Sequence, residues 1–104
     1  MTEPELAVTY TRQQIEEMRL EELAAEAGAR SIGTDALAAD FAPGTLGCHE
    51  AMHVASILSD DVERRLCQHP AVLASPEWFA LAKQAELALW NLYQAIGEVH
   101  LGRS

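Results

Sequence analysis

Residues 45–101, TLGCHEAMHVASILSDDVERRLCQHPAVLASPEWFALAKQAELALWNLYQAIGEVHL, hold two runs of helical periodicity separated by a short break. The first run begins at Thr45 and predicts a helix over residues 45–69, because Pro70 disfavours helical geometry in the residue before it. The second run, over residues 75–101, begins with an N-cap, an N1 proline and an early acid, which are Ser75, Pro76 and Glu77. Since the connection is short, we expect the two helices to form an antiparallel hairpin.

The two helices differ in how much of their surface is apolar. In the 45–69 helix, six residues spaced three and four apart predict one packing seam: Cys48, Ala51, Ala55, Leu58, Val62 and Leu66. In the 75–101 helix, apolar residues cover more than half of the cylinder, and one antiparallel partner cannot bury all of them. We therefore expect an N-terminal helix or a second subunit to cover the surplus, and we expect the protein to be a homodimer.

The segment ahead of the hairpin predicts a long helix. Thr11 and Gln14 form a capping-box pair before a run rich in Glu, Ala, Leu and Arg, and Gly28 can close that run. These signals place the helix over residues 11–28.

The remaining segments are short. A helical turn is expected over residues 34–40, and residues 1–10 are expected to form a loose leader. The whole chain, residues 1–104, is predicted to be one all-α domain, in which the N-terminal helix packs with the long C-terminal hairpin as a small helical bundle.

Acidic residues strongly outnumber basic ones. The chain carries 16 Asp and Glu against 7 Lys and Arg, a formal net charge of -9. This charge repels a phosphate backbone, so direct nucleic-acid binding is not expected. The same acidity suits a soluble protein, a docking surface for a basic partner, or a mimic of nucleic-acid charge.

Other features bear on the compartment. No apolar run approaches the roughly 20 residues of a membrane span, and the N-terminus carries acids where a signal peptide has basic residues. Cys48 and Cys67 lie too far apart on one predicted helix to form a disulfide with each other, and two free thiols suit a reducing compartment. We therefore expect no membrane association and a cytoplasmic location, in a bacterium or a phage-infected host cell.

The sequence HEAMH, residues 49–53, has the His-Glu-x-x-His spacing that places two imidazoles on one helical face. In this respect the segment resembles the catalytic helix of the zincin metalloproteases. The resemblance implies that His49 and His53 bind zinc and that Glu50 is the general base acting on zinc-bound water. Asp60, two turns further on, is the candidate third ligand, with Asp35 and Asp40 as alternatives from the N-terminal segment.

Three observations weigh against a zinc hydrolase. A motif of this length arises by chance, and the run after His53, VASILSDD, lacks the Gly and third His of the longer metzincin signature. The predicted seam also points His49 and His53 away from the 75–101 helix. Surface or interface histidines without a metal are therefore the first expectation, and a zinc site is the alternative.

Aromatic residues of the 75–101 helix are candidates for an interaction surface, because exposed aromatics anchor interfaces. The candidate residues, which fall outside the main apolar face, are Phe79, Trp90 and Tyr93.

The stretches CHEAMH, HPAV, SPEW and NLYQAIGEVHL of the C-terminal half are similar to small uncharacterised α-helical proteins of bacteriophages and prophages. This resemblance implies an accessory protein of a phage or mobile element. We expect a small acidic protein that binds another protein, as an interaction or inhibitor protein, without catalysis and without a cofactor. A minimal zinc metallopeptidase is the alternative function, and a nucleic-acid charge mimic is a further one.

Overall fold

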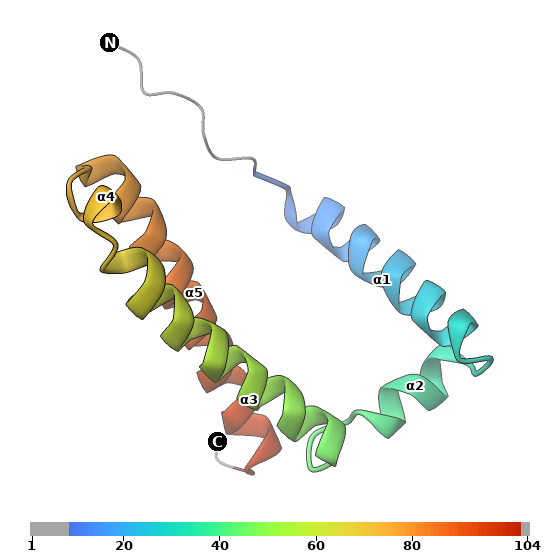
Figure 1. Cartoon of the computed structure of the whole chain (residues 1–104). Helices are drawn as coiled ribbons and strands as arrows, with labels where there is room; N and C mark the ends of the chain where they lie inside the picture. Colours follow the sequence, from blue (N-terminus) through green and yellow to red (C-terminus); the bar gives the residue numbers. More distant parts are fainter. Residues whose placement is uncertain (1–8, 103–104) are drawn as a thin grey trace. The chain divides into compact units, whose positions relative to one another are not determined.

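The computed structural model describes residues 9–102 of the chain (Figure 1). Within this range there are five α-helices, one π-helix and no strand, which confirms the all-α prediction. The elements are α1 (Arg12–Ala29), α2 (Thr34–Asp40), α3 (Leu46–Asp61), the π-helix η1 (Val62–Cys67), α4 (Pro70–Leu73) and α5 (Pro76–His100). None of these helices combines the length and the apolar character that crossing a membrane requires.

The chain divides into two compact units, Met1–Ala39 and Asp40–Ser104. The first unit contains α1 and all of α2 except its last residue, Asp40, and the second contains α3, η1, α4 and α5. The predicted packing of the N-terminal helix on the hairpin stays a prediction.

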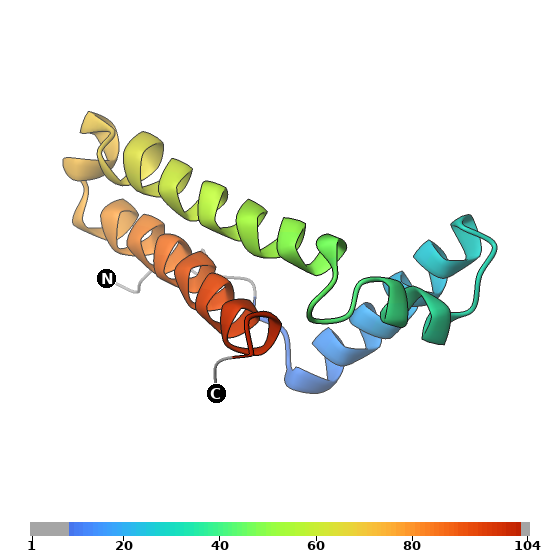
Figure 2. The ribbon, with the colours of Figure 1, turned by 90° about the horizontal axis from the view of Figure 1, so that it is seen from below.

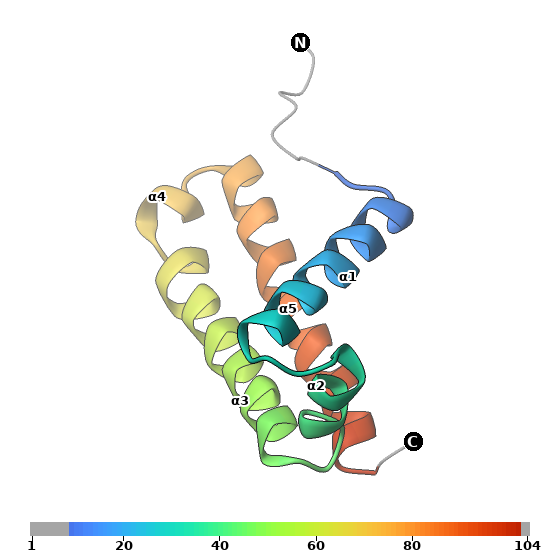
Figure 3. The same cartoon turned by 90° about the vertical axis from the view of Figure 1, so that its right-hand side faces the viewer.

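The C-terminal unit is a helical hairpin. α3 and η1 pack antiparallel against α5, and the helices lie side by side along their length (Figure 1, Figure 2 and Figure 3). The hairpin prediction is thus confirmed. Within the connection, Pro70 begins the short helix α4, which the sequence did not predict, and His69 caps it by accepting a hydrogen bond from the Ala71 N–H at 3.1 Å.

Both hairpin helices begin where their capping residues predict. The Thr45 hydroxyl accepts a hydrogen bond from the Cys48 N–H at 3.2 Å, and the Ser75 hydroxyl accepts one from the Trp78 N–H at 3.1 Å. Each bond satisfies one of the backbone donors that a helix N-terminus leaves without an intrahelical partner.

The last turns of the predicted 45–69 helix form the π-helix η1. A π-turn is wider than an α-turn, because its hydrogen bonds span five residues. The wider turn keeps Ser59, Glu63 and Cys67, four residues apart, on the side facing α5, where Ser59 and Cys67 are buried. Hydrophobic periodicity does not distinguish the two kinds of turn, so the sequence did not predict η1.

The N-terminal unit confirms the capping box. Thr11 accepts a hydrogen bond from the Gln14 N–H at 3.0 Å, and the Gln14 side chain accepts one from the Thr11 N–H at 2.8 Å. Gly28, however, does not close α1 as expected. The helix runs on to Ala29, and Ser31 adopts the left-handed conformation (φ 56°) that ends it. Residues 1–8 of the predicted leader lie outside the described residues.

The contact between the hairpin helices differs from the predicted seam. On α3 and η1 the buried residues are Met52, Ala55, Ser59 and Cys67. Three of the six predicted seam residues are instead exposed, namely Ala51, Leu58 and Leu66. Small residues make up much of the contact, since Ala55 and Ser59 on one side and Gly97 on the other are buried. The prediction was therefore wrong for half of the seam, because the larger apolar residues of α3 lie about one residue around the helix from the contact.

α5 carries two parallel rows of residues at the 3-4 spacing of a packing helix. The row that faces α3, called the inner row, is half-buried throughout and consists of Phe79, Ala82, Glu86, Leu89, Tyr93, Ile96 and His100. The neighbouring row, called the outer row, is apolar and exposed at every position and consists of Trp78, Leu81, Ala85, Ala88, Leu92, Ala95 and Val99. The expectation that one antiparallel partner cannot cover α5 is confirmed.

α3 has a matching exposed row, formed by Ala51, Val54 and Leu58. Each of these residues precedes a residue that faces α5, just as each outer-row residue precedes an inner-row residue. Two antiparallel helices are related by a two-fold axis perpendicular to the plane that contains them. Moving one residue back along either helix therefore turns toward the same face of the hairpin. The outer row and these three residues therefore form one surface, called the apolar face.

Candidate functional site

Two histidines and a backbone amide close one end of the hairpin. Nδ1 of His49 lies 3.3 Å from Nε2 of His100, and the ring centroids are 5.3 Å apart. The Gly44 N–H donates to Nδ1 of His100 at 2.8 Å. His49 therefore lies against the end of α5, whereas the predicted seam pointed it away from that helix.

This arrangement assigns the protons of the neutral rings. A backbone N–H only donates, so Nδ1 of His100 accepts from Gly44 and the proton of this ring lies on Nε2. That proton then points at His49, whose Nδ1 accepts it, and the proton of His49 lies on its own Nε2. The three groups form a hydrogen-bond relay from Gly44 through His100 to His49.

The relay opposes zinc binding by His49. A metal ligand needs an unprotonated ring nitrogen, and in the relay the unprotonated nitrogen of His49 is already occupied by His100. Binding zinc through Nε2 would move the proton to Nδ1 and set it against the proton on His100. Zinc binding by His49 thus requires the relay to break.

The other residues of the predicted zinc site are dispersed. Glu50 and His53 are exposed on α3, and Asp60 forms an ion pair with Arg64 at 2.9 Å. In the part of the chain that the structure describes, no three His, Cys, Asp or Glu side chains gather closely enough to hold a metal ion. The zinc ligands and the role of Glu50 stay predictions.

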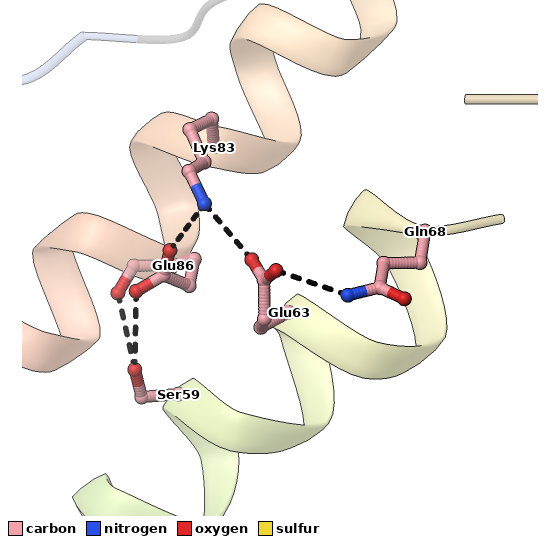
Figure 4. A network of polar contacts seen from close by, with 5 residues as sticks. All are labelled: Ser59, Glu63, Gln68, Lys83 and Glu86. Carbon is pink, nitrogen blue, oxygen red and sulfur yellow. Dashed lines mark hydrogen bonds and ion pairs between the residues drawn. The ribbon is translucent and has the colours of Figure 1, made fainter. Parts of the chain in front are cut away.

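An ionic cluster joins the two helices midway along the hairpin (Figure 4). Nζ of Lys83 on α5 lies 2.9 Å from a Glu63 carboxylate oxygen on η1 and 3.0 Å from one of Glu86. Glu63 also accepts a hydrogen bond from Gln68 at 3.3 Å, and the Ser59 hydroxyl lies 3.4 Å from the Glu86 carbonyl oxygen. The cluster links α5 to both α3 and η1.

The cluster shifts the pKa values of its members. The hydrogen bond from Lys83, with a second from Gln68, lowers the pKa of Glu63. The two carboxylates raise the pKa of Lys83, with the hydrogen bond to Glu63 as the largest cause. Burial raises the pKa of the neighbouring Cys67 thiol, which keeps that thiol protonated and poorly nucleophilic.

A hollow of about 400 Å³ adjoins this cluster. Its lining residues are Ser56, Ile57, Ser59, Asp60, Glu63, Glu86 and Trp90. Ser56, Asp60 and Trp90 each follow a residue of the helix contact by one position, so the hollow opens on the side opposite the apolar face. Its carboxylates are already paired within the hairpin, with Lys83 and Arg64.

The predicted aromatic residues lie in two environments. Phe79 and Tyr93 belong to the inner row and are half-buried, whereas Trp90 is 44% exposed beside the hollow. The rings of Trp90 and Tyr93 are in contact, with centroids 5.2 Å apart. The larger exposed surface is the apolar face, to which none of these three aromatic residues belongs.

Replacing Lys83 with Met is expected to lower the free energy of unfolding at neutral pH, because the link between α5 and η1 is lost. Glu63 has a lowered pKa in the folded protein, so its contribution is present above its usual pKa of 4.5 and disappears as the pH falls through the folded value. The difference between the Lys83→Met variant and the wild type should therefore shrink below about pH 4.5. Urea unfolding across this pH range measures the free energy of unfolding of both proteins. Arg64→Met is the control, because the ion pairs of Arg64 with Asp60 and Asp61 do not link it to α5. An equal, pH-independent loss in both variants would contradict the assignment.

Zinc is expected to bind the wild-type protein no more tightly than it binds the His49→Ala variant, because the relay occupies the ring nitrogen that zinc needs. Isothermal titration calorimetry with zinc chloride measures the affinity. Stoichiometric binding that is lost when His49 and His53 are both replaced with Ala would contradict this expectation and support the zincin-like site.

Comparison of the chain with protein-family models, with curated proteins and with solved structures finds no match. The site is therefore interpreted from its own residues, and the similarity of the C-terminal half to phage proteins stays a prediction.

Proposed function

We propose that this protein is a small acidic non-catalytic module that binds other protein molecules through the apolar face of its hairpin. The observation that carries the proposal is the outer row of α5, which is apolar and exposed at every position over three heptads. Exposed apolar surface of this extent is typical of interaction sites. Burying a Leu or Val side chain stabilises a complex by about 1.5–3 kcal/mol, so this row is a strong source of binding energy.

Charge distribution supports the same function. The net charge of -9 keeps the protein soluble and disfavours contact with nucleic acid, and the outer row itself contains no charged residue.

The proposal extends to the biological setting. From the likeness of its C-terminal half to small helical phage proteins, we infer that the protein is an accessory factor of a phage or mobile element, acting in the bacterial cytoplasm as an interaction or inhibitor protein. Binding by charge mimicry is the competing function, and it places the contact on the acidic side chains instead of the outer row.

Capture of bound proteins from a bacterial extract tests the proposal with two matched variants. Leu92→Glu introduces a carboxylate into the outer row, and Leu87→Glu introduces the same charge on the other side of α5, at a residue of similar exposure (50% and 47%). The wild type and Leu87→Glu are expected to retain the same bound protein at 1 M salt, where charge interactions are screened within about 3 Å. Leu92→Glu is expected to lose it. If Leu92→Glu still retains the captured protein, and if 1 M salt releases that protein, the result would favour charge mimicry.

A further inference from the structure

We infer that the occupant of the apolar face is a second copy of this chain, so that two hairpins form a four-helix bundle. This inference rests on the proposed function of the same face and names its partner. A hairpin of two helices has one contact seam, whereas a four-helix bundle encloses a core from all four helices. In the hairpin unit the buried side chains are few and mostly small, which leaves the larger apolar residues for the second seam.

The outer row is complementary to itself. In a two-fold symmetric interface both copies use the same surface. If one residue meets a second residue of the partner, the second residue also meets the first one of the partner. With two α5 helices antiparallel and Ala85 opposite Ala88, Leu81 lies opposite Leu92. The same register sets the largest residue of the row, Trp78, opposite the small Ala95. Paired alanines near the axis let the helices approach closely, and the larger side chains fill the space on either side.

Charge along α5 permits two acidic chains to meet there. From Leu87 to Gly97 the sequence contains no Asp, Glu, Lys or Arg. The acid just before this stretch, Glu86, is on the inner row and is paired with Lys83. A second copy with the same charge of -9 thus meets little repulsion at this row. Most of the rest of the sequence offers no such stretch without charged residues.

The length of the row suits a stable contact. In this register the paired part of the row runs from Trp78 to Ala95 and covers about 26 Å at 1.5 Å per residue. Ala51, Val54 and Leu58 widen the contact to both helices of each hairpin. This contact surface continues on η1 into a further hollow of about 370 Å³. The hollow is lined by Asp61, Val62, Arg65 and Leu66.

The mass of the full-length protein in solution, measured by light scattering during size-exclusion chromatography, tests this inference. The wild type is expected to run as a dimer with twice the chain mass of 11.4 kDa and to dissociate on dilution. Leu92→Glu is expected to raise the dissociation constant at least about 100-fold, since two leucines are lost per dimer at roughly tenfold each. Leu87→Glu, on the opposite side, is expected to leave the dimer intact.

Ala88→Glu is the second variant, placed where the two copies approach most closely. Circular dichroism checks that each variant stays helical.

A wild type that remains monomeric at every concentration overturns the inference without any variant. A dimer that Leu87→Glu weakens and Leu92→Glu does not weaken also overturns it. A monomer that still loses a captured bacterial protein through Leu92→Glu would leave the proposed function standing and refute only the second copy. A monomer whose capture is unaffected by Leu92→Glu would refute both.

Discussion

The structure depends on an imbalance in α5, which carries two adjacent rows of packing residues and meets one antiparallel partner. α3 and η1 cover the inner row, largely with small or polar side chains such as Ala55 and Ser59. The outer row keeps its large apolar residues in water. Since burial of apolar area is the dominant favourable contribution to folding and association, we propose this exposed row as the binding surface of the hairpin.

The two sides of the hairpin differ in their side chains and in the contacts that they make. Polar contacts, which are the His49–His100 relay and the Lys83 cluster, hold the helices in register at the end and in the middle of the hairpin. They lie beside or opposite the apolar face, so they orient it without occupying it. The relay also competes with the zinc site that the zincin-like motif predicts, because the spacing of two histidines says nothing about which ring nitrogen is free.

Local features could be predicted from the sequence, and long-range ones could not. The helix starts at Thr11, Thr45 and Ser75 follow from side chains that bond the backbone three residues on, so they are encoded within a few positions. The direction of α3 could not be predicted by the same means, and three residues of its predicted seam, Ala51, Leu58 and Leu66, lie exposed. The hydrogen bond between Gly44 and His100 could not be predicted either, since nothing in the sequence joins two residues that lie 56 positions apart.

Thermal unfolding of the full-length wild type over about a hundredfold range of concentration tests whether a second copy completes the fold of the hairpin. Contact with a second copy stabilises the folded state by mass action, so the midpoint of unfolding is predicted to rise steadily with protein concentration. A midpoint that stays constant across the range, with a single cooperative transition, would show that the monomer is stable alone and would contradict the account.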